Sequence, residues 1–134
     1  MSKLTVLMVG GLVTVLSGCT MLDSRPPEEI VAERSLARVE ALMDGDYDAA
    51  YVFTTPGYQS IETSERYGIR WAGVGMWEDV IVRDVTCLPA ESPNLCKLSM
   101  EVRFKAMRQE AQTTALFEDW VLMDGVWYFS QKRL

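Results

Sequence analysis

The spacing of the apolar residues changes once along this chain, close to Trp77, and that change limits the folds it can adopt. Before this point apolar positions recur every three or four residues, as in a helix, and after it they alternate with polar ones, as in a strand. Helices followed by strands are typical of an α+β domain. We therefore expect N-terminal helices packed on a curved antiparallel sheet of about four strands.

Three helical segments are predicted in the first half. The segment "PEEIVAERSLARVEALMDGD" has Pro27 in its first turn and Gly45 just past its end. A short helix is expected from Asp46 to just before Pro56, and "TSERYGIRWAGVG" predicts an irregular third helix. The spacing of the first segment predicts these core-facing side chains: Ala32, Leu36, Val39 and Met43.

Four strands are predicted in the second half, in the order of a meander. In "WEDVIVRDVTC" the alternation is imperfect and indicates a bulge, whereas "KLSMEVRFKA" alternates cleanly. The stretch "MRQEAQTT" indicates a polar connection to "ALFEDWVLM" and "VWYFSQ", which Asp124-Gly125 joins as a hairpin because both turn positions need positive φ. The core-facing residues expected on the second strand are Leu98, Met100, Val102, Phe104 and Ala106.

The N-terminus has the three regions of a secretory signal peptide: one lysine, an apolar run, and small residues. The run from Leu4 to Leu16 is shorter than the about 20 residues that a membrane-spanning helix needs. The ending Leu16-Ser17-Gly18-Cys19 resembles the lipobox of bacterial lipoproteins. This resemblance implies cleavage before Cys19, lipidation of its thiol and acylation of the new amino terminus; the alternative is a retained anchor helix.

The organisation that follows is a cleaved signal peptide (1–18), a lipidated tether (19–27) and one α+β domain (28–134). The residue after the cysteine is Thr20 rather than aspartate. In lipoproteins of a Gram-negative host, that choice implies the outer membrane, with the domain facing the periplasm. Two or more acyl chains hold a protein firmly on the bilayer, where one chain does not.

Two further cysteines support an oxidising compartment. Cys87 and Cys96 flank "LPAESPNL", a proline-containing loop between strands, and we expect them to form a disulfide. Two free buried thiols are the alternative. A structural zinc site would lack its usual ligands, because the chain has no histidine.

The charge of the chain disfavours two classes of partner. Aspartate and glutamate number 19 against 13 lysines and arginines, for a net charge of −6. An acidic domain lacks the basic patch that binds phosphate backbones, so no nucleic-acid partner is expected. The same charge opposes binding to anionic lipid, so attachment to the bilayer should depend on the acyl chains of Cys19.

Several stretches together resemble the NTF2-like superfamily, whose domains are cone-shaped and cystatin-like. They are "LMDGDYDAAYVFTTPGY", the Arg70-Trp71 segment and "WVLMDGVWYF", and the resemblance covers about residues 28–131. It implies a conical cavity between sheet and helices. In some members, ketosteroid isomerase among them, carboxylates, tyrosines or histidines act there, and some members dimerise through the sheet.

Two adjacent carboxylates are the candidates for chemistry in such a cavity. Glu118 and Asp119 lie in an otherwise apolar strand, so their side chains must point to opposite faces. Glu118 faces inward if Trp120 does, and Asp119 faces inward if Trp120 points outward. A buried carboxylate is costly unless it is paired or functional. The alternative is that one of them pairs with Arg83 or Arg103 across the exposed sheet.

Aromatic residues could line a ligand cavity, although core packing is the alternative for each of them. Arg70 beside Trp71 could bind a carboxylate or an aromatic ligand, or could cap the edge of the core. The other candidates for lining are Tyr51, Tyr58 and Trp120.

No spacing marks a nucleophile, a phosphate-binding loop, a metal site or a cofactor site. The sequence therefore favours a lipid-anchored, non-catalytic interaction module of the cell envelope, whose partner is an envelope protein or a second copy bound through the sheet. The alternatives are a binder of a small apolar molecule in the cone and a cavity enzyme that uses Glu118 or Asp119.

Overall fold

A computed structural model describes residues 23–132 of the chain. The expected signal peptide, Cys19 and the first part of the tether lie outside the described residues. Within them, no helix is both long enough and apolar enough to cross a bilayer. The elements in chain order are α1 (Pro27–Met43), α2 (Tyr47–Tyr51), α3 (Pro56–Gln59), α4 (Ser64–Arg70), the 3-10 helix η1 (Ala72–Met76), β1 (Trp77–Leu88), β2 (Leu95–Phe104), β3 (Gln112–Met123) and β4 (Val126–Phe129).

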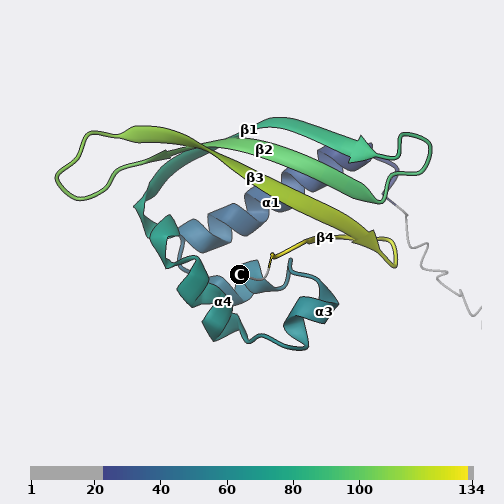
Figure 1. Cartoon of the computed structure of the whole chain (residues 1–134), viewed down its shortest axis with the longest axis horizontal. Helices are drawn as coiled ribbons and strands as arrows, with labels where there is room; N and C mark the ends of the chain where they lie inside the picture. The colour runs from purple at the N-terminus through teal and green to yellow at the C-terminus, as the bar shows by residue number, and fades with distance from the viewer. Residues whose placement is uncertain (1–22, 133–134) are drawn as a thin grey trace, which may run out of the picture.

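The fold class is the expected one, an α+β domain with its helices on one face of a four-stranded antiparallel sheet. The strands pair in the order β1-β2-β3-β4. Figure 1 shows α1 lying across the inner face of the sheet, with α3 and α4 closing the structure beneath it. No described element covers the outer face, where Ile81 is 42% and Phe117 76% exposed.

Each helix begins where local chemistry predicts. Pro27 occupies the first turn of α1, and Gly45 takes a φ of 74° after its end. The Asp46 side chain accepts a hydrogen bond from the Ala49 N–H and starts α2. This helix ends at Tyr51, earlier than expected, because Phe53 and Thr54 pair with Phe129 of β4. Pro56 then opens a separate helix, α3.

The buried face of α1 differs from the predicted stripe. Of the four predicted residues, Val39 is fully buried, whereas Ala32, Leu36 and Met43 are half-buried. The fully buried positions are Val31, Ser35, Arg38, Val39 and Leu42. They follow helical spacing, but two of them are polar and were not counted as core. The prediction is confirmed for Val39, and Met43 packs against the core, but the buried face is centred on Ser35 and Arg38 because these side chains bind a buried carboxylate, described below.

The sheet confirms most of the strand predictions. The register of β1 against β2 shifts at two places, which confirms the bulge, and Leu98, Met100 and Val102 of β2 are buried. Asp124 and Gly125 take φ of 49° and 79°, as the hairpin turn requires. Strand β3 begins at Gln112, inside the predicted polar connection, because it pairs with β2 along its full length as far as Phe104.

Cys87 and Cys96 form the expected disulfide. They are direct partners in the β1–β2 register, with Cα atoms 4.0 Å apart. Both residues belong to the main core. The bridge therefore ties the hairpin together next to its proline-containing loop.

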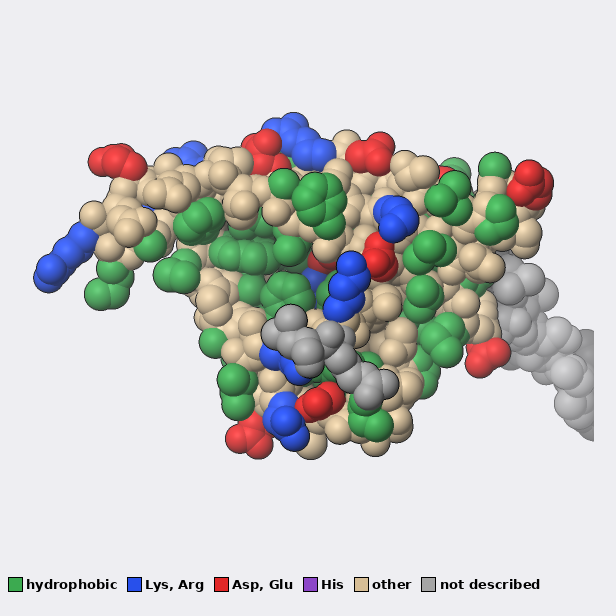
Figure 2. Space-filling model, viewed as in Figure 1, with side chains coloured by type: hydrophobic (Ala, Val, Ile, Leu, Met, Phe, Trp, Pro, Cys, Tyr) green, Lys and Arg blue, Asp and Glu red, His purple; other side chains and the backbone are tan. Residues whose placement is uncertain are grey.

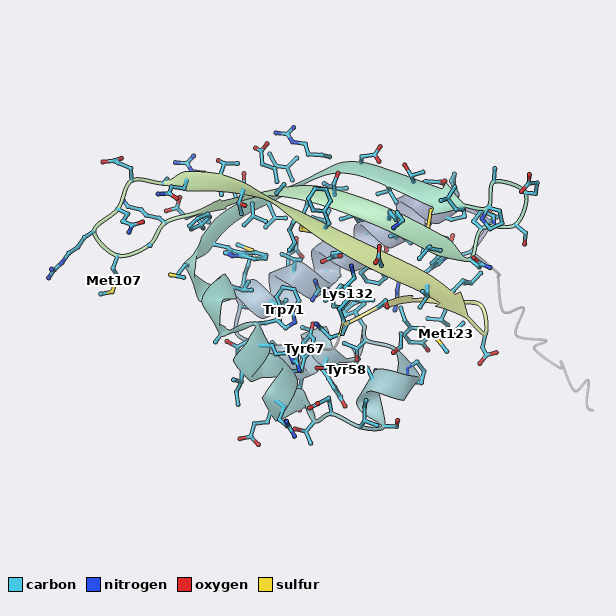
Figure 3. The ribbon with its side chains drawn as sticks, in the orientation of Figure 1. Tyr58, Tyr67, Trp71, Met107, Met123 and Lys132 are labelled. Carbon is cyan, nitrogen blue, oxygen red and sulfur yellow. A yellow bond between two sulfur atoms is a disulfide. The ribbon has the colours of Figure 1, made fainter. Side chains whose placement is uncertain are left out.

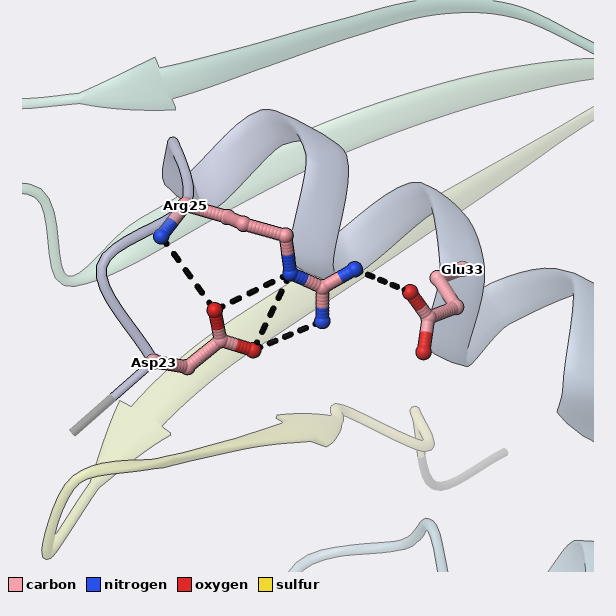
Figure 4. A network of polar contacts seen from close by, with 3 residues as sticks. All are labelled: Asp23, Arg25 and Glu33. Atoms are coloured by element: carbon pink, nitrogen blue, oxygen red, sulfur yellow. Dashed lines mark hydrogen bonds and ion pairs between the residues drawn. The ribbon is translucent and has the colours of Figure 1, made fainter. Parts of the chain in front are cut away.

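The chain enters α1 through an exposed ion-pair network. Arg25 binds Asp23, with Nε 3.0 Å from Oδ1, and it also binds Glu33 of α1 (Figure 4). The Arg25 hydrogen bonds lower the pKa of the Asp23 carboxyl. Exposed pairs of this kind contribute little to stability, so the network orients the last residues of the tether rather than holding the fold together.

Candidate functional site

A buried ion pair occupies the interior of the cone. Arg38 of α1 binds Glu118 of β3, and the two residues are 0% and 2% exposed. The Ser35 hydroxyl donates to Oε2 of Glu118 at 2.6 Å, and the Trp120 indole N–H donates to the same oxygen at 2.7 Å. Oε1 accepts from the guanidinium. Both oxygens of the carboxylate are therefore engaged by protein donors.

The guanidinium of Arg38 is held on several sides. Its Nη1 lies 2.7 Å from the Tyr67 hydroxyl oxygen. Its Cζ lies 3.8 Å from the ring centroid of Phe129 and 4.6 Å from that of Trp71. Among the described residues, Nε of Arg38 has no hydrogen-bond partner. Burial raises the pKa of Tyr67, and the nearby Arg38 opposes that rise.

This geometry decides between the alternatives for the two carboxylates. Glu118 points inward together with Trp120, and Asp119 points outward. Asp119 lies 3.7 Å from Nζ of Lys97 and 3.5 Å from Nζ of Lys132. The alternative, that one of these carboxylates pairs with Arg83 or Arg103, is wrong, because these arginines instead pair with Glu101 and Glu78, their neighbours on the sheet.

The arrangement suits structure better than proton transfer. A general base needs a free oxygen within reach of a substrate. Both oxygens of Glu118 accept hydrogen bonds from protein donors, and the residue is only 2% exposed. Asp119 is partly exposed, but it lies between two lysines on the outer face. Within residues 23–132 there is also no group of carboxylates and cysteines able to hold a metal ion.

The tyrosines predicted to line a cavity pack against one another instead. The ring centroids of Tyr51 and Tyr58 are 6.4 Å apart, and Tyr58 meets Tyr67 edge-on at 6.2 Å. The Tyr51 hydroxyl donates to the Gln59 carbonyl at 3.1 Å. Trp120 is completely buried. These side chains fill the space that an open cone would leave.

Arg70 and Trp71 do reach an open recess. Together with residues of η1, β1, β2 and β3 they line a hollow of about 350 Å³. Figure 2 shows apolar side chains gathered there, in the gap between the sheet and the helices. Figure 3 shows the labelled Trp71 beneath the sheet. The Trp71 indole N–H donates to the Gln131 side chain at 3.1 Å, which fixes its ring. A second hollow, of about 560 Å³, has the two predicted carboxylates Glu118 and Asp119 in its lining, together with Phe117 and Lys132.

Sequence reasoning missed Arg38, Ser35 and Tyr67. A signal for the first two was present, because Val31, Ser35, Arg38 and Leu42 recur at the spacing of one helical face. An arginine in the middle of such a face indicates a buried partner. Nothing local identifies that partner, since Glu118 lies 80 residues further along the chain.

Comparison with known proteins supports the fold alone. No protein-family model and no curated protein matches the sequence. Among solved structures, a SEC-C motif-containing protein of Psychrobacter arcticus superposes with a TM-score of 0.60 at 14% identity, over 81% of this chain and 63% of its own, which is less than two thirds of its length. A second SEC-C motif-containing protein, from Rhodopseudomonas palustris, gives 0.54 at 18% identity, over 70% of each chain.

A Campylobacter jejuni protein described as an NTF2-like transpeptidase gives a TM-score of 0.50 at 15% identity, over 75% of this chain and 98% of its own. The chain therefore has an NTF2-like fold, as its sequence motifs indicated. Fold similarity at these identities carries no activity with it.

Proposed function

We propose that this chain is a lipid-anchored protein of the bacterial cell envelope whose NTF2-like domain binds another envelope protein and catalyses no reaction. The observation that carries the proposal is the filled cone. In other arrangements of this fold the interior could hold a ligand, but here Arg38, Tyr67 and Trp120 occupy it and saturate Glu118. The hollows that remain in the described residues open at the surface, beside Trp71 and beside Asp119, so the domain is expected to act through its surface.

The anchor part of the proposal depends on the N-terminal sequence. The lipobox Leu16-Ser17-Gly18-Cys19 and the signal peptide before it favour export and lipidation. The disulfide between Cys87 and Cys96 is consistent with an oxidising compartment. With Thr20 after the cysteine, we expect the outer membrane, with the domain facing the periplasm.

The proposed binding of an envelope protein depends on exposed apolar side chains. Phe117 is 76% exposed on the outer face of the sheet, with Ile81 42% exposed on the same face. Phe117 lies opposite Ser99 of β2 and Ile81 lies opposite Glu101, so the two exposed side chains flank the central strand. Large apolar side chains left open on an unpartnered sheet are candidate contacts for a partner. A second copy of the chain is an alternative occupant of this face. Binding of a small apolar molecule is the second candidate function, favoured by the hollow beside Trp71.

The test is capture of the full-length lipidated protein from crosslinked envelopes, with mass spectrometry of both proteins and extracted small molecules. We expect one envelope protein in stoichiometric amount. The Cys19→Ser variant serves as the control for the anchor, because it should leave the membrane fraction. A retained small molecule with no protein would overturn the proposal in favour of the second candidate.

A further inference from the structure

Strand β3 has an open edge. It runs from Gln112 to Met123, but β4 pairs only with Trp120–Met123. The Asp119 carbonyl accepts a hydrogen bond from the Ser130 N–H, so this carbonyl points away from β2. Backbone groups of a strand alternate with a period of two. The N–H and C=O of Phe117, Ala115 and Thr113 therefore point to the same open side, where no strand within residues 23–132 pairs with them.

This edge lacks the devices that normally keep a sheet edge from pairing. Those devices are charged side chains, prolines and bulges. The sequence "QTTALF" from Gln112 to Phe117 has no charge and no proline, and its register with β2 is regular. The opposite edge strand, β1, has two register shifts and several charges, which are Glu78, Asp79, Arg83 and Asp84. One edge of the sheet is protected and the other is not.

An apolar hollow lies directly under the open edge. Thr114 of β3 lines it, together with Trp77 of β1 and Phe104 of β2. Trp71, Val74 and Met76 form its opposite wall, and its volume is about 350 Å³. A strand added beside β3 would turn every second side chain toward this inner face. The hollow has room for large apolar side chains at those positions.

Cations without carboxylate partners surround the edge. Arg70 lines the hollow. Lys105 lies beside it, because its backbone N–H donates to the backbone carbonyl of Met76, which is part of the hollow's wall. Arg108 lies in the loop that leads into β3. None of these three side chains forms an ion pair with any residue between 23 and 132. The loop that contains Arg108 also contains one carboxylate, Glu110, so three cations against one anion leave a net positive charge beside this edge of an otherwise acidic chain.

We infer that the open edge of β3 binds an extended peptide segment of another protein, with apolar side chains at alternate positions and carboxylates at its ends. The inference rests on the proposed function, because it names the contact surface of the interaction module and the chemistry of its partner. Backbone hydrogen bonds to Thr113, Ala115 and Phe117 supply the pairing, the hollow receives the apolar side chains, and the cations select acidic ends.

A second copy of this chain is a poorer occupant of the edge. Of the carboxylates that flank Gln112–Phe117 in another molecule, Glu118 is buried with Arg38 and Asp119 pairs with Lys97 and Lys132, so within the described residues only Glu110 of these is free to be offered. Two copies would also bring the same excess of positive charge to the interface, with Arg70, Lys105 and Arg108 on each side. Like charges placed together across an interface oppose association.

The test uses the full-length chain in detergent and a fluorescent octapeptide probe, EITVTFTE. We expect saturable binding, and slower hydrogen exchange at the amides of Thr113, Ala115 and Phe117 when the probe is added. The Ala115→Pro variant removes one outward N–H without touching the β2 ladder, and should weaken binding by about tenfold. The matched Ala115→Val variant keeps the N–H and should bind as the parent does.

The charge requirement is tested separately. The probe KITVTFTK should bind the parent protein less tightly than EITVTFTE, and Arg70→Glu should narrow or reverse that preference. Equal binding by the Ala115→Pro and Ala115→Val variants, with no change in hydrogen exchange at the edge, would overturn the inference. Equal affinity for both probes would overturn the acidic partner.

Photocrosslinking in cells separates this inference from the proposed function. A crosslinker at Thr113 reports on the edge, and one at Ser99 reports on the outer face of the sheet. We expect an adduct at Thr113, lost when Ala115→Pro is added, with an acidic extended segment as the crosslinked peptide. An envelope adduct only at Ser99 would overturn the edge while keeping the interaction module. An adduct of two copies of this chain at Thr113 would overturn the inference, and no adduct at either position would overturn both.

Discussion

At the scale of single residues, the buried pair of Arg38 and Glu118 strongly limits which substitutions the interior tolerates. Taking two charges out of water is costly, and their attraction offsets the cost only when the remaining donors and acceptors are satisfied. Ser35, Tyr67 and Trp120 satisfy most of them around Arg38 and Glu118. Removing one partner therefore leaves the other buried without compensation, which is far more destabilising than losing an exposed pair.

We predict that Glu118→Gln lowers the free energy of unfolding by about 3–5 kcal/mol. Glutamine has the same size, but its amide nitrogen would face donors from Arg38, Ser35 or Trp120. The adjacent Asp119→Asn is the matched control, and should cost less than about 1 kcal/mol because its pairs are exposed. Urea unfolding of both variants checks this. Equal losses would mean that the interior pair has no special role.

At the scale of secondary-structure elements, local sequence predicts some features of the fold and misses others. The strand positions, the bulge of β1 and the Asp124-Gly125 turn were predictable, because period and turn chemistry are local. The start of β3 was not, since its pairing with β2 decides it. The buried face of α1 was missed for a similar reason: Arg38 is a core residue only because Glu118 comes from a distant strand.

Close packing between α2 and α4 leads to a prediction for Gly68. A Cβ added there would lie 2.8 Å from Cγ of Tyr47, so one of the helices must shift. We expect Gly68→Ala to destabilise the fold by about 1–3 kcal/mol, outweighing the gain in helix propensity of about 0.5–1 kcal/mol. Gly73→Ala is the control, because nothing lies within 4 Å of its added Cβ. Similar melting temperatures for the two variants would contradict the packing argument.

The β1–β2 hairpin gives a second prediction at this scale. Cys87 and Cys96 close a short loop, which should stabilise the fold by roughly 2.5–3 kcal/mol through the entropy of the unfolded chain. Reducing agent should lower the melting temperature while leaving the domain folded at room temperature. The double variant Cys87→Ser with Cys96→Ser should melt at the lower temperature with or without reductant. If reductant left the melting temperature of the parent protein unchanged, the result would show that the bridge does not form in solution.

At the scale of the whole molecule, the two ends of the sheet have different roles in the proposed function. Asp23 and Pro27 line one surface pocket together with Pro93 and Gly125, so the tether leaves beside the β1–β2 loop and the β3–β4 turn. Figure 3 places Met107, in the β2–β3 loop, at the opposite end. An anchor at Cys19 would therefore hold the first end near the bilayer and turn the open edge of β3 toward the periplasm.

This separation of anchor and domain leads to the last prediction. Cys19→Ser removes the thiol that the lipobox presents, so the protein should leave the membrane fraction. Its melting temperature should match that of the parent domain, because α1, at which the described fold begins, starts only at Pro27. The disulfide variant should behave in the opposite way, staying in membranes while melting earlier. Fractionation that finds Cys19→Ser still firmly membrane-bound would refute lipidation, and the apolar run from Leu4 to Leu16 would then be the anchor itself.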